Sequence, residues 1–167
     1  IQGFAAHLNT TFRTERVIRI IDSLSTEIAE EMPNDVARWS GHTTAGGSGC
    51  SPISSIDQWD EHLEIMKEFA RQRPDIIRQQ IISRYNLSGM AELSLEANGG
   101  SISIGGVENA SSGLYFKDMP IRMQAIPNTG YQFVGWENIS SLAEISVNLT
   151  HDTLIRAVFI PNGGTIL

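Results

Sequence analysis

The spacing between apolar residues changes near Gly89, and this change constrains the fold more than any other feature of the sequence. Before Gly89, apolar residues recur at intervals of three and four, which is the period of a helix that buries one face. After Gly89 they alternate with polar residues, which is the period of a half-buried strand. We therefore predict an α+β protein in two segregated parts, with a helical bundle over residues 1–89 and a small all-β domain over residues 90–167.

The first helix is predicted over residues 14–32. Its apolar residues form one stripe, made of Val17, Ile18, Ile21, Leu24 and Ile28. The hydroxyl of Thr14 can cap the start of this helix. Pro33 is expected to stop it after Met32, because the residue before a proline disfavours helical backbone angles. A short second helix is predicted over residues 34–39.

Two more helices are predicted after a loop rich in Gly and Ser at residues 43–55. Ser55 and Gln58 have the spacing of a capping box, which satisfies free backbone N–H groups at a helix start. We predict that the buried side of the helix that they open is lined by Trp59, Leu63, Met66, Phe69 and Ala70. Pro74 is expected to break this helix and to begin a last one, which ends near Asn86.

Short strands separated by turn residues are predicted in the second part of the chain. Residues 93–97 lead through the turn Asn98-Gly99-Gly100 into residues 101–104, which is the pattern of a β-hairpin. Further strands are predicted over residues 120–127, 131–136, 144–149 and 153–160. In the first of these, Ile121, Met123 and Ala125 alternate with Arg122 and Gln124.

The charge balance argues against a polyanionic partner. The chain has 12 Lys and Arg against 19 Asp and Glu, a net charge of −7. Split at Gly89, the first part has −3 (9 against 12) and the second −4 (3 against 7), so neither offers a basic surface to nucleic acid. No apolar run approaches the roughly 20 residues that cross a bilayer, so we expect no membrane span.

Residue types that carry metal or nucleophilic chemistry are sparse. Cys50, the single cysteine, excludes an internal disulfide and a Cys-rich zinc site, and its role as a nucleophile or a plain loop residue stays open. The four histidines, His7, His42, His62 and His151, lack the spacing of metal ligands. We therefore expect no catalytic, cofactor-binding or metal-binding residues in this chain.

Tyr131, Phe133 and Trp136 are the candidate binding residues. Their rings could stack on a sugar or a peptide, which would make them a surface for a carbohydrate or protein partner. A small β-domain, however, needs large side chains to fill its core. We favour the core interpretation over the binding one.

The second part of the chain contains a spaced series of glycines and aromatic residues. A glycine turn is followed by a strand ending in A-x-P, by G-Y-x-F-x-G-W, and by a closing strand ending in A-x-F; the matching residues are Ala125, Pro127, Gly130, Tyr131, Phe133, Gly135, Trp136, Ala157 and Phe159. Over residues 90–160 this series resembles the divergent internalin B-type repeat of bacterial surface proteins. The resemblance implies a β-grasp or sandwich fold. Residues 107–120 depart from it, being longer and more polar than a repeat loop.

The helical part of the chain carries a different series of motif residues. A long helical pattern leads into Glu31-Met32-Pro33 and Arg38-Trp39, and a later one contains F-A-x-x-R-P at residues 69–74. Over residues 4–87 this is similar to the C-terminal end of the spore-coat CotH family, which are secreted or surface proteins with a protein-kinase-like fold. Surface repeats commonly follow such domains, so the order of the two resemblances is consistent.

The CotH resemblance implies ATP, Mg²⁺ and phosphate transfer to a protein hydroxyl for a longer parent protein. The corresponding parts are not found in this sequence. The glycine-rich segment 99–106 lacks the G-K-[ST] ending of a P-loop and a following helix, and the two lysines, Lys67 and Lys117, lie on a helix and in a β-domain loop. We expect the catalytic residues upstream of Ile1, together with an export signal that directs the protein to the bacterial cell surface or exterior.

We therefore expect a non-catalytic C-terminal part of a CotH-like protein. Its helices would support an upstream kinase-like domain, and its repeat would act as a spacer or an adhesion module. The apolar stripes should then pack on upstream structure as well as on each other, and the chain alone should expose an apolar patch. The alternatives are a part of an atypical protein kinase acting on extracytoplasmic or spore-coat proteins, and a surface module that binds carbohydrate or peptide.

Overall fold

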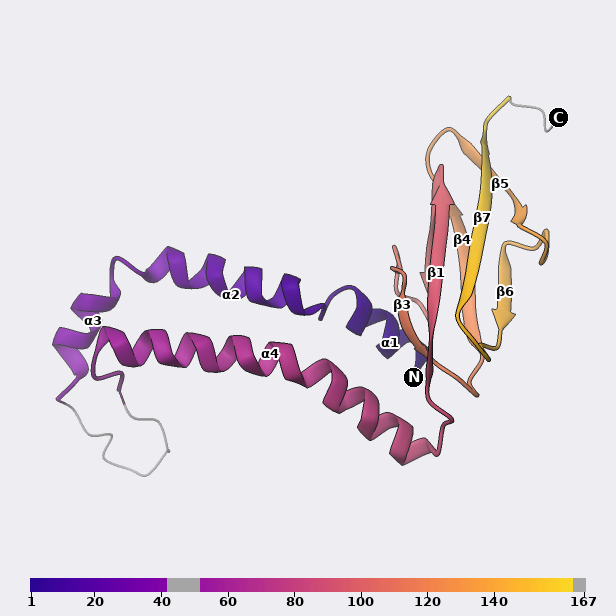
Figure 1. Ribbon diagram of the computed structural model, residues 1–167. Coiled ribbons are helices and arrows are strands. Elements are labelled where there is room, and N and C mark those ends of the chain that lie inside the picture. Colours follow the sequence, from indigo (N-terminus) through magenta and orange to yellow (C-terminus); the bar gives the residue numbers. More distant parts are fainter. Residues whose placement is uncertain (42–51, 164–167) are drawn as a thin grey trace. The chain divides into compact units, whose positions relative to one another are not determined.

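The computed structural model describes residues 1–41 and 52–163, and Figure 1 shows the arrangement of their elements. Within these residues the helices are α1 (Gln2–Asn9), α2 (Thr14–Ile28), α3 (Met32–Trp39) and α4 (Ile56–Tyr85). The strands are β1 (Met90–Asn98), β2 (Gly100–Ile104), β3 (Gly113–Phe116), β4 (Ile121–Pro127), β5 (Tyr131–Trp136), β6 (Glu144–Val147) and β7 (Thr153–Pro161). The predicted fold class, with helices before Gly89 and strands after it, is confirmed.

The helix α2 ends before it reaches Pro33. α2 ends at Ile28, and residues 29–31 form a turn. Pro33 lies in the first turn of α3, where a missing N–H removes no helical hydrogen bond. The predicted helix end at Met32 is therefore wrong, because the proline opens the next helix and does not close the preceding one.

α4 continues through Pro74, so the predicted break at this proline is also wrong. Within a helix, proline leaves the carbonyl oxygen four residues earlier without its backbone donor, here the oxygen of Ala70. The Thr14 hydroxyl donates a hydrogen bond of 3.1 Å to this oxygen. A side chain at the start of α2 thus supplies the donor that Pro74 lacks, and it is used for this contact in place of the predicted helix cap.

The predicted capping box at the start of α4 forms in part. The Gln58 N–H donates to the Ser55 hydroxyl oxygen at 3.1 Å, as expected. The Gln58 side-chain oxygen accepts from the N–H and the hydroxyl of Ser54, at 2.6 and 2.8 Å, so its partner is Ser54 and not the Ser55 backbone. The helix start is still satisfied by side chains from both directions.

The strands form two sheets. Sheet A has the strand order β3-β1-β7-β5, and sheet B has the order β2-β4-β6. β1 and β7 are parallel, while the pairs β1–β3, β2–β4, β4–β6 and β5–β7 are antiparallel. β3 falls in the polar segment 107–120, where no strand was predicted, and its Tyr115 and Phe116 are fully buried.

The glycine turn after β1 does not make the predicted hairpin. β1 and β2 lie in different sheets, so the turn carries the chain from sheet A to sheet B. A Cβ atom on Gly99 would lie 2.4 Å from the ring of Tyr131, and one on Gly100 would lie 2.4 Å from the ring of Phe159. The two glycines therefore make room for aromatic rings where the sheets meet, and a hairpin turn is not what requires them.

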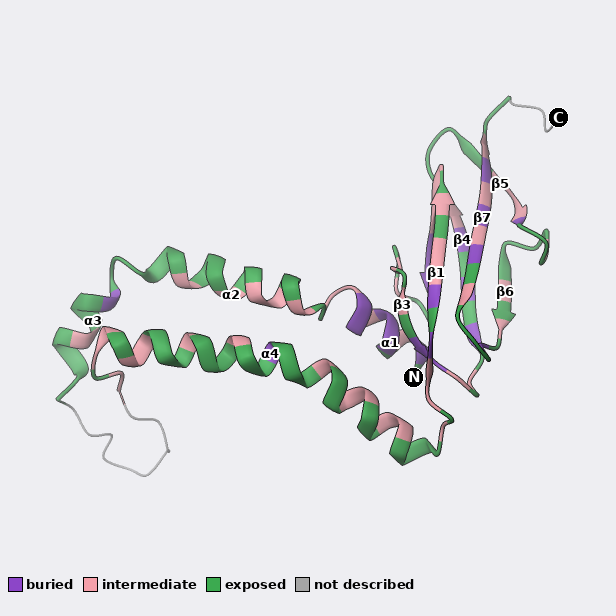
Figure 2. Cartoon of the chain, viewed as in Figure 1, coloured by how far each residue is buried: buried purple, intermediate pink, exposed green. Residues whose placement is uncertain are grey.

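Both sheets contribute to one apolar core (Figure 2). Its strand residues include Leu93, Ile102, Ile104, Ile121, Met123, Ala125, Ile155, Ala157 and Phe159. The predicted alternation in β4 is confirmed, because Ile121, Met123 and Ala125 are buried while Arg122 and Gln124 are exposed. The β-domain is thus a small two-sheet fold with one polar face on β4.

α1 was not predicted, and it belongs to this same core. Ala5 and Ala6 are buried among the core residues of the strands. The backbone of α1 also touches the turn after β2: a Cβ atom on Gly3 would lie 2.9 Å from the Gly105 carbonyl oxygen. The first helix of the chain is therefore part of the β-domain's packing.

Two side-chain amides of α1 form hydrogen bonds with backbone groups at one edge of sheet A. Gln2 donates from Nε2 to the carbonyl oxygens of Phe116 (2.7 Å) and Met119 (3.0 Å), and its Oε1 accepts from the Phe116 N–H (3.2 Å). Asn9 donates from Nδ2 to the Leu114 carbonyl oxygen at 3.0 Å. Phe116 and Leu114 lie on β3, an edge strand of sheet A, so these amides bond to it as a neighbouring strand would.

Packing divides the chain into two compact units whose bounds differ from the change in period. The β-unit comprises Ile1–Arg13 and Ile77–Leu167, and the helical unit comprises Thr14–Ile76. Ile81 and Ile82, near the end of α4, pack against the β-unit core. Gly89 marks the change from helix to strand. The boundaries between the two units lie elsewhere, one between α1 and α2 and the other within α4.

The Gln2 contact predicts a large effect on the β-unit. Gln2→Ala should lower the free energy of unfolding by about 2–4 kcal/mol, because it leaves buried backbone groups of β3 without partners. Urea unfolding followed by Trp136 fluorescence, with Trp39 and Trp59 replaced by Phe, would measure this change. Gln80→Ala, at an exposed position of α4, is the control and should change little; equal effects of the two variants would contradict the prediction.

The Thr14–Ala70 contact predicts coupling between Thr14 and Pro74. Thr14→Val should cost about 1 kcal/mol when residue 74 is proline, because the Ala70 oxygen then also lacks the backbone N–H of residue 74. In a Pro74→Ala background the backbone N–H returns, and the cost should fall. A double-mutant cycle on urea unfolding measures the coupling, and additive effects would show that the hydroxyl does not replace the missing N–H.

Candidate functional site

The structure separates the three candidate aromatic residues. Trp136 is 2% exposed and belongs to the core. Phe133 meets Trp136 and Phe159 edge-on, with ring centroids 5.8 and 5.6 Å apart. Tyr131 keeps 38% of its surface exposed. Two of the three rings therefore fill the β-unit, and Tyr131 alone presents much of its ring to solvent, so the three do not make one stacking platform.

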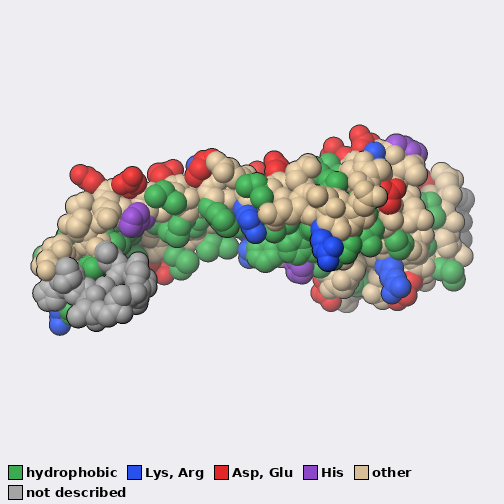
Figure 3. Space-filling model, turned by 90° about the horizontal axis from the view of Figure 1, so that it is seen from below, with side chains coloured by type: hydrophobic (Ala, Val, Ile, Leu, Met, Phe, Trp, Pro, Cys, Tyr) green, Lys and Arg blue, Asp and Glu red, His purple; other side chains and the backbone are tan. Residues whose placement is uncertain are grey.

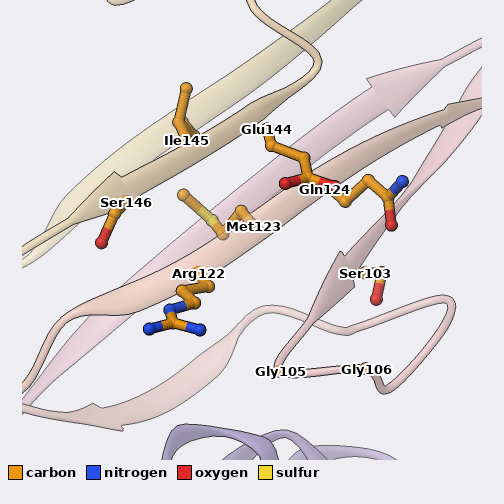
Figure 4. A pocket seen from close by; sticks show the side chains of 9 residues that line it. All are labelled: Ser103, Gly105, Gly106, Arg122, Met123, Gln124, Glu144, Ile145 and Ser146. Carbon is orange, nitrogen blue, oxygen red and sulfur yellow. The ribbon is translucent and has the colours of Figure 1, made fainter.

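Sheet B carries a hollow on the face away from the core (Figure 4). It has a volume of about 600 Å³ and is bordered by the turn Gly105-Gly106. Its polar lining comes from all three strands and consists of Ser103, Arg122, Gln124, Glu144 and Ser146. Figure 4 shows Arg122 and Ser146 pointing away from Met123 and Ile145, whose side chains turn to the opposite side.

The sequence alone did not reveal this hollow. The only sequence signal for the hollow was the alternation in β4, which placed Arg122 and Gln124 on one face of the strand. The neighbours of these residues are set by strand register, with Ser146 opposite Arg122, and Glu144 and Ser103 on either side of Gln124. Register between strands far apart in the chain was not predicted, so the residues could not be assembled.

The outer face of sheet A is different, because it carries a cluster of paired charges. The Arg156 guanidinium donates to Glu96 at 2.6 Å and to Glu137 at 2.7 Å. These carboxylates, Glu96 first, raise the pKa of Arg156 above its usual value. This cluster is exposed, so it contributes to local order more than to stability.

The helical unit carries apolar side chains that its own helices do not cover (Figures 2 and 3). We define its outer stripes as Ile20, Leu24 and Ile28 on α2 and Ile65, Phe69 and Ile76 on α4. Leu24 is 57% exposed and Phe69 is 63% exposed. The prediction that Met66 and Phe69 lie on the buried side of α4 is therefore wrong, while Ala70 is buried as predicted. Among the described residues α2 buries none, α3 buries Met32, and α4 buries Ala70. The expectation of an exposed apolar patch is confirmed for these residues.

The inner sides of α2 and α4 are occupied by their mutual contacts. Lys67 bonds to Asp22 of α2 at 2.8 Å and to Glu64 at 2.9 Å, and both hydrogen bonds raise the pKa of the lysine. Together with the Thr14–Ala70 hydrogen bond, this ion pair links the two helices. Lys67 therefore has a structural role in the helical unit, and the outer stripes remain uncovered.

Candidate metal and nucleophilic residues do not assemble in the described part of the chain. Within residues 1–41 and 52–163, no group of three or more His, Cys, Asp and Glu side chains is placed to hold a metal ion. His7 bonds to Thr11 and His151 to Thr150, while His42 and Cys50 lie outside the described residues. No described helix is long and apolar enough to cross a membrane.

The fold and its surfaces define a modular protein, in which helices with uncovered apolar stripes precede a packed two-sheet β-domain. Residues 1–77 match the family model described as CotH kinase protein, and residues 92–163 match the divergent InlB B-repeat domain. Both resemblances expected from the sequence are confirmed, in the expected order. No curated protein and no solved structure matches the chain significantly.

The outer stripes predict self-association of the chain. Leu24→Ser and Phe69→Ser should each reduce association in light scattering and binding of a hydrophobic dye, because they remove exposed apolar area. Their effect on stability should be within about 1 kcal/mol, since neither side chain is buried. Leu142→Ser, which alters a leucine of the β-unit that is 69% exposed, is the matched control. A monomeric chain that binds no dye would contradict this prediction.

Proposed function

We propose that this chain is a non-catalytic part of a CotH-like bacterial surface protein, in which the helical unit completes a kinase-like domain and the B-repeat acts as a spacer or adhesion module. The outer stripes of α2 and α4 carry this proposal. Their six side chains are between 41% and 63% exposed, which a pair of helices in a complete domain would not need. The match of residues 1–77 to the CotH kinase protein family supports a kinase-like domain as the structure that would cover them.

The geometry of the helices supports an upstream partner within the same protein. The residues of each outer stripe are spaced by four or seven, so each stripe runs along one side of its helix. The half-buried residues Val17, Ile18 and Ile21 lie on the adjacent side of α2. The apolar surface of α2 is thus wider than α4 alone covers, and a third element is needed to bury it.

The β-unit supports the spacer role in a different way. Its core is closed within the unit, and one edge of sheet A is satisfied by α1. On the outer face of sheet A, Arg156 forms ion pairs with Glu96 and Glu137. A domain with its own core and a protected edge suits a module that stands at the cell surface without aggregating. The extracellular or cell-surface location is part of this proposal.

A role within an active protein kinase is the alternative, and the name of the matching family favours it. If the parent protein transfers phosphate, the residues that hold ATP and Mg²⁺ are expected outside this chain. Lys67 is engaged by Asp22 and Glu64, and Lys117 lies in the loop after β3. The chain's contribution to such an enzyme would be the apolar support of α2 and α4.

A nucleotide titration tests the proposal. Isothermal titration of this chain with ATP and Mg²⁺ should show no binding, while the chain extended by its natural upstream sequence should bind nucleotide if the parent is a kinase. The extension should also slow amide hydrogen exchange in the outer stripes, because it covers them. Nucleotide affinity in the chain alone, or outer stripes that stay unprotected in the extended protein, would overturn the proposal.

A further inference from the structure

The hollow on sheet B gathers polar side chains that have no partners in the part of the chain that the structure describes. Arg122 lies directly opposite Ser146, and Gln124 lies between Glu144 and Ser103 in the sheet register. The side chains of these five residues make no hydrogen bond or ion pair with any other part of the described chain. Arg122 and Glu144 are diagonal neighbours on adjacent strands, yet they are not paired.

The fold does pair such charges elsewhere. On sheet A, Arg156 is held by Glu96 and Glu137 at 2.6 and 2.7 Å. Glu96 lies directly opposite Arg156, whereas Arg122 and Glu144 are diagonal neighbours and stay unpaired. Arg122 and Glu144 are therefore open to a ligand, while Arg156 is not.

Ser103 contributes a hydroxyl that is open to the hollow. The residue as a whole is 6% exposed, and its hydroxyl has no partner among the described residues. This hydroxyl is not among the described side-chain atoms that are fully buried without a partner, so solvent reaches it. Because Ser103 lines the hollow, a ligand seated there can hydrogen-bond to it.

The rim of the hollow is fixed before any ligand arrives. The Gly105 N–H donates to the Arg122 carbonyl oxygen at 3.1 Å. On its other side, Gly105 rests against α1, where a Cβ atom on Gly105 would lie 2.8 Å from Gly3. Gly106 has a φ of +85° and open space around its Cα. The turn thus offers bare backbone to the hollow from a fixed position, which lowers the entropic cost of binding.

The chemistry of the lining selects the ligand class. Arg122 only donates, Glu144 only accepts, and the two serines and Gln124 do both. The charges of Arg122 and Glu144 sum to zero, so neither a free anion nor a free cation is favoured. Sugar hydroxyls both donate and accept, and the volume of about 600 Å³ lies within the range of small-ligand sites. We propose that this hollow binds a neutral carbohydrate, independently of the role of the helical unit.

An NMR titration of the whole ¹⁵N-labelled chain tests this site. The probes are maltotriose, galactotriose and tri-N-acetylchitotriose as neutral sugars, with trigalacturonate as the acidic comparison. At least one neutral sugar should shift the amide signals of residues 103–106, 122–124 and 144–146 in a saturable way. The signals of the helical unit, which is the subject of the separate functional proposal, should not move.

Three variants locate the binding. Ser103→Ala and Arg122→Gln should each weaken the neutral sugar about fivefold, the equivalent of one hydrogen bond. Ser101→Ala, two residues earlier on the same strand and outside the hollow, should leave the affinity unchanged. The amide spectra of all three variants show whether the fold is kept.

Several outcomes would overturn the proposal. Saturable shifts confined to the surroundings of Tyr131 would place the binding elsewhere. Shifts with trigalacturonate alone would make the hollow an anion site. Equal affinities of Ser103→Ala and the unaltered chain, or no saturable shift with any neutral sugar at its highest soluble concentration, would show that the open side chains are only hydrated.

Discussion

The contact between the Gln2 side chain and the edge of β3 is the interaction on which the rest of the β-unit depends. Its amide satisfies both the N–H and the carbonyl oxygen of Phe116, which are buried and would otherwise lack partners. This contact holds α1 in place, and α1 in turn positions Gly3 against the turn after β2. At the other end of the helix, Asn9 accepts a hydrogen bond of 3.1 Å from Arg78, so the last part of α4 is fixed to the same element. A helix matched to the CotH family is thus a structural member of the repeat that follows it.

The two units differ in how far their apolar residues are buried. The β-unit closes a core around Leu93, Tyr115 and Phe116, each fully buried. The helical unit leaves Leu24 and Phe69 more than half exposed. Burial of apolar surface is the main favourable term in folding, so a pair of helices with so little of it depends on further contacts for stability. This difference is the physical basis for the proposal that the helices support a larger domain and that the β-unit is a spacer.

The residues that carried the CotH resemblance have separate structural roles. Met32, the first residue of α3, is buried, and Pro33 lies in the first turn of the same helix. In the segment F-A-x-x-R-P, Pro74 leaves the Ala70 carbonyl oxygen without its helical donor, and this oxygen accepts from the Thr14 hydroxyl, whereas Phe69 faces outward. Arg73 lies over the Phe69 ring at 5.8 Å, and Arg38 lies over the Trp39 ring at 5.0 Å, which keeps these exposed rings partly covered by cations.

The sequence by itself determined the change from helices to strands at Gly89, the alternation in β4 and the two family resemblances, because these follow from local periodicity and short spaced motifs. It did not reveal α1 or β3. It did not determine where α2 ends or that α4 passes through Pro74, since the donor that replaces the proline N–H is Thr14, far away in the chain. It also misjudged the turn at Gly99, because the choice between a hairpin and a crossing of sheets depends on β1 pairing with β7. The hollow beside Ser103 and Arg122 came only from the tertiary structure, since its residues are brought together by pairing between strands that are distant in sequence.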